Sequence, residues 1–190
     1  VSFVDDVHSL PDSVRLVAQF MAMGLVLWQV CLMDGLSVMG DCGLLVKGLV
    51  FVAALFVSVG ATNIINFMDG INGITGGYSL AVLVPVMIVN AQATLGCGGF
   101  GDAGAEIIDH TLLNVVALSL IVFCIFNFRP KNKAKCFAGD VGSVGIAYIL
   151  LFAIGMLIAR TGDVTWLVLL LVYGVDGCLT ICHRFMLHEH

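Results

Sequence analysis

The sequence predicts an all-α, polytopic transmembrane helical bundle with about six spans, formed by a single domain over residues 1–190. Composition is the first observation behind this prediction. Hydrophobic residues make up 60% of the chain and charged residues only 11%, whereas a soluble domain contains roughly 45–50% apolar and 25% charged residues. The mean hydropathy of +1.08 agrees with an integral membrane protein.

Six apolar windows, separated by more polar stretches, are the second observation. Each window is long enough, or nearly so, to cross ~30 Å of hydrocarbon as an α-helix. A helix is required because lipid offers no hydrogen-bond partner to an open backbone. The windows cover residues 14–33, 43–61, 76–93, 111–128, 141–159 and 164–182.

Charge differs between the two sets of connecting segments, and this difference predicts the orientation in the membrane. The segment 129–140 alone contains four of the eight Lys and Arg residues of the chain. With six spans it shares one side with segments 1–13, 62–75 and 183–190. Because cytoplasmic loops carry an excess of Lys and Arg, we expect this side to face the cytoplasm. The same rule would explain the basic segment without any binding role.

This side also carries carboxylates and amides that the topology rule does not require. They fall in "FVDD", "NIINFMDGING" and "AGDVGS", each close to a predicted span end. The residues are Asp5, Asp6, Asn63, Asn66, Asp69, Asn72 and Asp140. If a helix continues through residues 63–72, its four polar residues share one stripe. A single polar group here is most simply a helix cap or an interhelical contact, but several on one side favour a functional site, because polar groups at membrane depth are costly.

These residue types point to a site for a metal ion and a phosphate. The adjacent carboxylates of Asp5 and Asp6 repel each other, which favours a role as a proton acceptor or as part of a divalent metal site. Carboxylate and water ligands favour Mg²⁺ or Mn²⁺ over zinc. A helix that begins near Val141 would offer free N–H groups to a phosphate. Phe137 could stack on a base or lie at the membrane interface, and the residues alone favour the interface.

Four segments occur in an order typical of one enzyme superfamily. They are "FVDD", "NIINFMDGINGI", "FNFRPKNKAKCFAGDVGS" and "VDGCLTICHRFMLH". The chain resembles the polyprenyl-phosphate N-acetylhexosamine-1-phosphate transferases of glycosyltransferase family 4, which include phospho-N-acetylmuramoyl-pentapeptide transferase. The second and third segments are most similar to the bacterial branch that initiates O-antigen or capsule synthesis. Members have more spans, so the resemblance implies a transferase domain truncated at both ends.

The resemblance implies a reaction and a location. We expect transfer of N-acetylhexosamine-1-phosphate from a UDP-sugar to undecaprenyl phosphate, with release of UMP, to initiate a cell-envelope glycan such as the O-antigen of lipopolysaccharide. The expected cofactor is Mg²⁺, with Mn²⁺ as an alternative. The expected location is the bacterial inner membrane, with a multi-pass chain and an active site that faces the cytoplasm. The partners would be both substrates and the lipid bilayer, without nucleic acid, and a homodimer is left open.

The resemblance also implies roles for individual residues. Asp5 and Asp6 match the paired aspartates that position or deprotonate the lipid phosphate, and Asp140 matches the aspartate that binds Mg²⁺. Asp69 is the third expected catalytic residue. The expected substrate-binding residues are Asn63, Asn66, Asn72, Lys133 and Phe137.

Two of these positions differ from what the residues alone indicate or from the family pattern. By resemblance, Phe137 stacks on uracil, which reverses the interface interpretation. Many members carry Asp where this chain has Asn72, so the resemblance supports hydrogen bonding there more than catalysis.

Rival interpretations place the carboxylates differently. A transporter or ion-pathway fragment predicts acidic residues near the middle of the membrane. An intramembrane aspartyl protease requires two facing aspartates within adjacent spans. Asp140 and Asp176 could be forced into that role, but Asp140 opens its predicted span instead of lying within it, and the basic segment would be unexplained. An inert structural subunit would leave the polar segments on one side as a coincidence.

Overall fold

The computed structural model describes residues 2–8, 11–31, 43–96, 106–129 and 133–187, and every regular element in these ranges is helical. The prediction of an all-α bundle is therefore confirmed. In chain order the elements are α1 (Ser2–Val7), α2 (Asp12–Val30), α4 (Leu44–Phe67), α5 (Ile74–Thr94), α6 (His110–Asn127), α7 (Gly139–Thr161), η2 (Val164–Leu170) and α8 (Leu171–Leu187).

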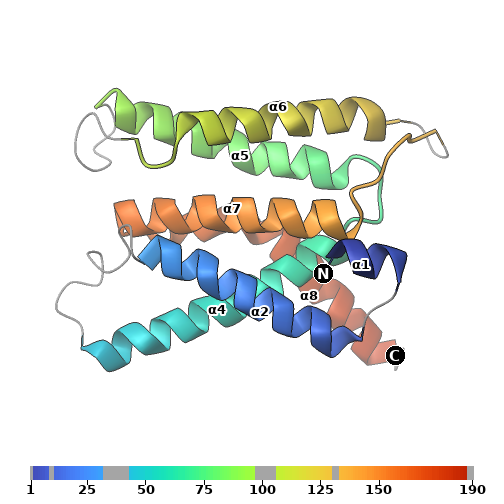
Figure 1. Cartoon of the computed structure of the whole chain (residues 1–190), viewed down its shortest axis with the longest axis horizontal. Coiled ribbons are helices and arrows are strands. Elements are labelled where there is room, and N and C mark those ends of the chain that lie inside the picture. The colour runs from blue at the N-terminus through green and yellow to red at the C-terminus, as the bar shows by residue number, and fades with distance from the viewer. Residues whose placement is uncertain (1, 9–10, 32–42, 97–105, 130–132, 188–190) are drawn as a thin grey trace.

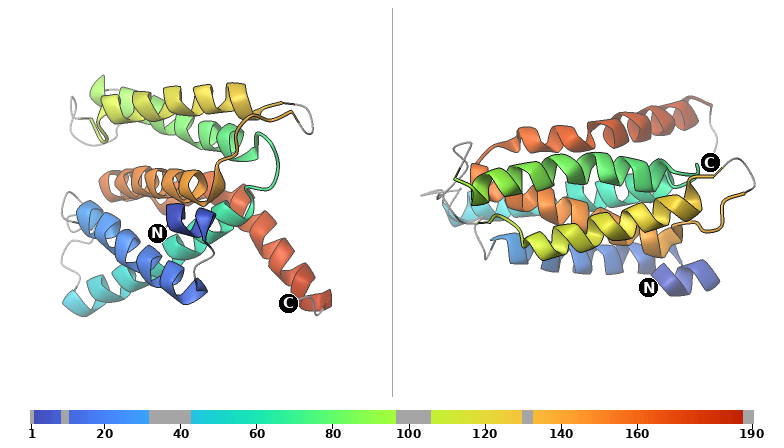
Figure 2. Two further views of the ribbon diagram at one scale, coloured as in Figure 1. Left: turned by 45° about the vertical axis from the view of Figure 1, so that its right-hand side comes forward. Right: turned by 90° about the horizontal axis from the view of Figure 1, so that it is seen from above.

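Five of these helices, namely α2, α4, α5, α6 and α7, are long and apolar enough to cross a membrane. They correspond to the first five predicted windows. The sixth window forms a shorter apolar helix, Val164–Thr180, which begins as a 3₁₀ helix in η2 and continues into α8. The right-hand view of Figure 2 shows the long helices lying roughly side by side, as expected for a multi-pass membrane protein.

Helix α7 lies at the centre of the bundle. Figure 1 shows it between the α5–α6 pair and the α2–α4 pair, and α7 contacts α2, α4 and α5. Leu150 and Leu157 of α7 are fully buried, and small residues such as Ala147 and Ala153 allow close helix approach. The polar start of α7 is therefore held in a fixed position relative to four other helices, including α1.

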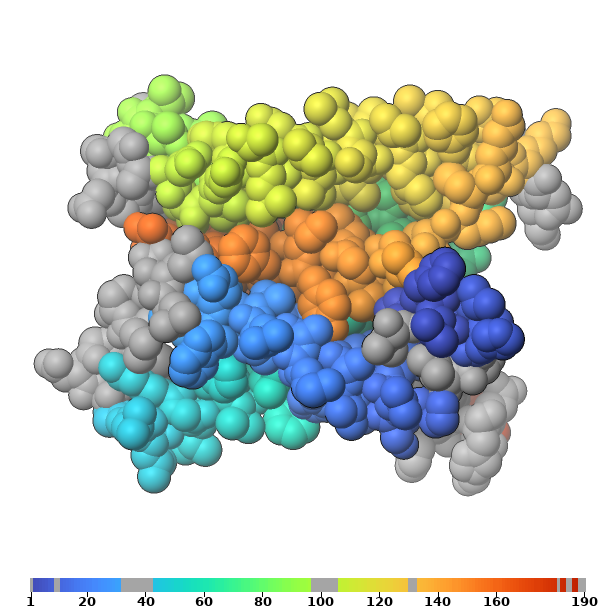
Figure 3. Space-filling view, viewed as in Figure 1, coloured from blue at the N-terminus to red at the C-terminus, as the bar shows by residue number. Residues whose placement is uncertain are grey.

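The outward surface of the other helices is apolar. Leu25, Phe56 and Leu118 are each more than 60% exposed, and they lie on α2, α4 and α6, whose outer faces run along the bundle in Figure 3. Exposed apolar side chains along whole helices are typical of a surface that faces lipid, where they cost nothing.

Local sequence explains several helix ends away from the site. Asp109 accepts a hydrogen bond from the Thr111 N–H at 2.6 Å and begins α6, and Asp163 accepts from the Thr165 N–H at 2.9 Å and begins η2. These bonds lower the pKa of both carboxyls, because they stabilise the charged form. Two acidic residues at the end of the bundle opposite α1 are thus helix caps.

One helix does not continue through residues 63–72, so the condition under which the four polar residues would share one stripe is not met. Helix α4 ends at Phe67, and Met68 to Gly73 form turns before α5. Gly73, with φ of 87°, adopts the left-handed conformation that favours glycine. Asn63 and Asn66 therefore lie on α4, while Asp69 and Asn72 lie in the turn beyond it.

We predict that Leu150→Ala lowers the free energy of unfolding by about 2–5 kcal/mol, because it opens a cavity in the fully buried face of α7. Thermal or denaturant unfolding in detergent micelles measures the change. Leu118→Ala is the matched control, since its side chain is 63% exposed on α6. Equal losses in the two variants would show that α7 is not the packed centre.

Candidate active site

Carboxylates from three separate stretches of the chain meet at the end of the bundle that contains α1. Asp5 and Asp6 come from α1, Asp69 from the turn after α4, and Asp140 from the first turn of α7. We refer to these four residues as the acidic cluster. Its members are brought together because α1 and α4 both pack against α7.

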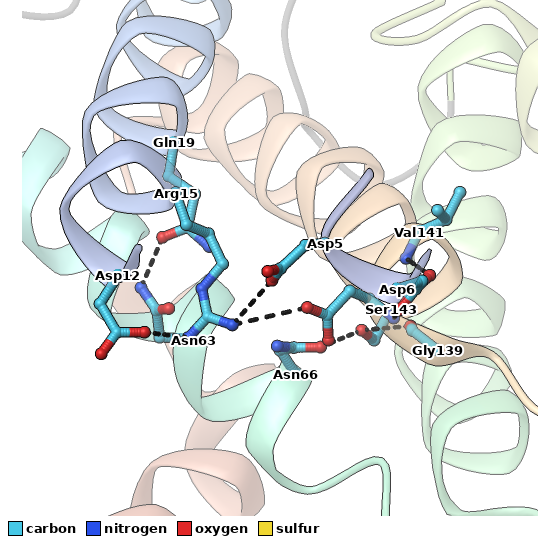
Figure 4. Close-up of polar contacts among 11 residues, drawn as sticks. Asp5, Asp6, Asp12, Arg15, Gln19, Asn63, Asn66, Gly139, Val141 and Ser143 are labelled. Carbon is cyan, nitrogen blue, oxygen red and sulfur yellow. Dashed lines mark hydrogen bonds and ion pairs between the residues drawn. The ribbon is translucent and has the colours of Figure 1, made fainter. Parts of the chain in front are cut away.

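Arg15 of α2 is the cation that joins two members of the acidic cluster. Its Nη1 lies 3.1 Å from Asp5 Oδ2 and 3.5 Å from Asp140 Oδ2, as Figure 4 shows for the labelled Asp5. Its Nη2 lies 3.8 Å from Asp12, which is exposed. The guanidinium, which remains charged at any relevant pH, thus offsets the repulsion between the carboxylates of α1 and α7.

Asp6 caps the start of α7. Its two carboxylate oxygens accept hydrogen bonds from the backbone N–H groups of Asp140 at 3.0 Å and Val141 at 3.3 Å. Gly139, with φ of 59°, makes this approach possible, since a Cβ there would lie 3.2 Å from the carboxylate. The helix start predicted for a phosphate near Val141 is therefore present, but the side chain of Asp6 binds its N–H groups.

Asp69 is half-buried beside the same helix start. It accepts a hydrogen bond from the Thr75 hydroxyl, and the backbone of Gly139 lies close enough to stabilise its charged form. Burial raises the pKa of the Asp69 carboxyl above its ordinary value, and the interactions with Thr75 and with the Gly139 backbone oppose that rise. A carboxylate in this position is readily stabilised by an added cation.

The two amides on α4 face different partners. Asn66 Oδ1 accepts a hydrogen bond from the Ser143 hydroxyl of α7, and its side chain also interacts with the Asp140 carboxyl. Asn63 Nδ2 donates to Gln19 Oε1 of α2 and to the Val59 carbonyl, both at 2.8 Å. The structure therefore brings Asn66 into the acidic cluster and places Asn63 at the α2–α4 contact beside it.

The remaining predicted substrate-binding residues lie in the adjoining loops. Asn72 Nδ2 donates to the Arg129 carbonyl at 3.4 Å. Lys133 and Phe137 have exposed side chains, and the Phe137 ring is 73% exposed. These side chains are accessible to a ligand, and they lie in the loops beside the acidic cluster instead of within it.

An apolar groove of about 480 Å³ adjoins the acidic cluster. Its polar edge is formed by Arg15, Asn63 and Asn66, and the rest of its lining comes from the end of α4 and from α8. The lining residues from α4 and α8 are Gly60, Ile64, Phe67, Gly177 and Thr180. The groove therefore leads from an apolar surface to the charged end of the bundle.

The acidic cluster supplies the type of donors that Mg²⁺ prefers. Oxygen atoms of Asp140, Asp69 and Asn66 are hard ligands. Within the described part of the chain, no group of three His, Cys, Asp or Glu side chains is arranged to hold a metal ion. Such a group is not required, because Mg²⁺ usually takes one or two carboxylates and completes its shell with water and substrate phosphates. The donor chemistry of Asp140, Asp69 and Asn66 is therefore compatible with this ion.

Arg15, Gln19 and Ser143 are site residues that sequence reasoning missed. Arg15 lies in the first turn of α2, close in the sequence to Asp5, Asp6 and Asp12, and a cation at the start of a span beside acidic residues is the signal that could have found it. Gln19 lies one helical turn further along α2 on the same face. Ser143 lies within the motif "AGDVGS" that drew attention to Asp140.

The fold and the site together define a multi-pass helical membrane protein with an acidic cluster beside an apolar groove. The family model of glycosyl transferase family 4 matches residues 1–177. The chain belongs to this family, which confirms the resemblance found in the sequence.

Known relatives are similar over part of the chain. A probable undecaprenyl-phosphate N-acetylglucosaminyl 1-phosphate transferase of Bacillus subtilis is 32% identical over 47% of this chain and 21% of its own length. Phospho-N-acetylmuramoyl-pentapeptide-transferases of Desulfitobacterium hafniense and Dictyoglomus turgidum are 28% and 32% identical, each over 68% of this chain. The chain spans 37% and 36% of their respective lengths. No solved structure matches it.

We predict that Arg15→Gln lowers the free energy of unfolding by about 1–2 kcal/mol at neutral pH, after allowance for its partial exposure. The reason is that Asp5 and Asp140 would face each other without a shared cation. Thermal unfolding in detergent at low ionic strength measures the loss, and added salt should recover part of it. Lys135→Gln, at an exposed position, is the control. The prediction would be contradicted if Arg15→Gln were as stable as the unaltered protein.

Proposed function

We propose that the whole protein transfers N-acetylhexosamine-1-phosphate from a UDP-sugar to undecaprenyl phosphate and releases UMP. The observation that carries this proposal is the convergence of the acidic cluster and Arg15 beside an apolar groove at one end of a membrane bundle. The printed name of the Bacillus subtilis relative supports the reaction class. We further propose that this end faces the cytoplasm of a bacterial inner membrane, where the soluble nucleotide sugar is available.

The reaction must bring two anionic phosphates together, and the site is built to offset that repulsion. We assign Asp140 and Asn66 to the metal ion, with support from Asp69. Bound Mg²⁺, or Mn²⁺ in its place, would neutralise the diphosphate and make UMP a better leaving group. Arg15 supplies a fixed cation on the other side of Asp140 that suits the acceptor phosphate.

The acceptor phosphate must lose a proton to become a good nucleophile. Asp6 already holds the start of α7 through two hydrogen bonds, so its use as a base would disturb that helix. Asp5 lies beside Arg15, close to where that cation would hold the acceptor phosphate, so we assign Asp5 by its position as the proton acceptor and Asp6 as the residue that positions α7. The isoprenoid tail would lie along the groove between α4 and α8.

The donor nucleotide would occupy the loop side of the cluster. Phe137 exposes a ring face on which uracil can stack, and Lys133 is an exposed cation in the same segment. Asn72 and Asn63 would supply amide hydrogen bonds to the donor nucleotide sugar. The placement of the acidic residues at the end of the bundle favours this enzyme over an ion pathway, which needs carboxylates along the membrane interior.

A direct assay tests the proposed reaction. Membranes that contain the full-length protein are incubated with a radiolabelled UDP-N-acetylhexosamine, undecaprenyl phosphate and Mg²⁺. We expect a labelled lipid product and an equal amount of UMP, and neither should form without the lipid acceptor. Absence of product with every UDP-N-acetylsugar tested would reject the transferase.

We predict that Asp140→Asn lowers kcat by about 100-fold or more while the protein still inserts into membranes, because a neutral amide binds Mg²⁺ weakly. The variant should also need a higher Mg²⁺ concentration for half-maximal rate. Asp176→Asn is the control, since Asp176 is an exposed carboxylate on α8 that is not a member of the acidic cluster. Full activity of Asp140→Asn would refute the metal role.

A further inference from the structure

A second set of contacts lies behind the acidic cluster. Asn127 is the last residue of α6 and is only 5% exposed. Its Oδ1 accepts a hydrogen bond from the backbone N–H of Gly73 at 2.6 Å, and its Nδ2 donates to the backbone carbonyl of Cys136 at 2.7 Å. One buried amide therefore joins the turn after α4 to the segment before α7, which are far apart in the sequence.

Both of these loops lead to the acidic cluster. Gly73 directly precedes α5, and Thr75 in the first turn of α5 donates to Asp69. Cys136 shortly precedes Gly139, whose backbone lies close enough to Asp69 to stabilise the charged form of that carboxyl. The turn after α4 and the segment before α7 are therefore joined at two places, once through Asn127 and once at Asp69.

Neighbouring contacts make the end of α6 a rigid attachment point. The Lys135 N–H donates to the Phe126 carbonyl at 3.0 Å. A Cβ on Gly73 would lie 2.3 Å from the Phe128 ring, so the turn is packed directly against the residue that follows α6. Neither loop can shift without disturbing these contacts.

We infer that Asn127 is a positioning residue that sets the placement of Asp69 relative to Asp140. It acts through the two loops and not by contact with the reacting groups, and the inference rests on the proposed function for the use of those carboxylates. An amide suits this position because one end must accept a hydrogen bond while the other donates. A carboxylate would place a second acceptor against the Cys136 carbonyl in a buried site.

Hydrogen–deuterium exchange of the full-length protein in detergent tests, independently of catalysis, whether Asn127 joins the two loops. Asn127→Asp keeps the acceptor for Gly73 and loses the donor to Cys136. We expect the Lys135 amide to exchange about 5–30-fold faster while the Gly73 amide stays protected. Asn127→Leu removes both groups, so both amides should exchange faster. Unchanged exchange at both amides in Asn127→Leu would show that Asn127 does not hold the two loops together.

Asn90 provides a matched control for the effect on catalysis. It is fully buried near the opposite end of the bundle, where its Oδ1 accepts from the Ile107 and Ile108 N–H groups and its Nδ2 donates to the Ile108 carbonyl at 2.7 Å. Asn90→Asp therefore breaks an equivalent anchor away from the acidic cluster. Both Asp variants should have a lower Tm.

Only Asn127→Asp should lower kcat/KM, by about 10–100-fold, when both variants are assayed well below their Tm. Equal kcat/KM values for the two variants would overturn the positioning role and leave Asn127 as a structural anchor. If the unaltered protein forms no lipid product, the proposed function fails. The exchange measurements still decide whether Asn127 joins the two loops.

Discussion

Neutralisation of like charges at the start of α7 is the constraint on which the rest of the structure depends. Three carboxylates, those of Asp5, Asp6 and Asp140, approach one another only because Arg15 and the first N–H groups of α7 offset their repulsion. Helix α1 has no buried residue, so polar contacts with α2 and α7 hold it in place. The charged groups that form the site therefore also assemble this end of the bundle.

Apolar patterning was sufficient to predict the architecture, since lipid permits few alternatives to helices. It was less informative about helix ends. Helix α4 continues for six residues beyond its apolar window, through "TNIINF", because interhelical partners satisfy its polar side chains. A hydropathy window cannot include such partners, which come from α2 and α7. Likewise, nothing in the alternation of residues indicated that the sixth window would begin as a 3₁₀ helix.

The placement of the acidic residues at span ends on one side of the membrane was sufficient to predict which of them would come together. The catalytic and binding roles of these residues come from the family resemblance and remain predictions. Arg15 and Asn127 were missed for the same physical reason. Each acts across elements that are distant in the sequence, so its partners cannot be identified from its own segment. Asp6 shows the converse, because its helix-capping contacts separate it from Asp5 although the two residues are adjacent.

The 3₁₀ start of the last membrane segment has a consequence for its reach. A 3₁₀ helix rises ~2.0 Å per residue and an α-helix ~1.5 Å. The seven residues of η2 therefore extend over roughly 14 Å, and the apolar part of α8 adds about as much again. Stretching its first turns allows a segment too short for an ordinary α-helical span to match the thickness of the hydrocarbon layer.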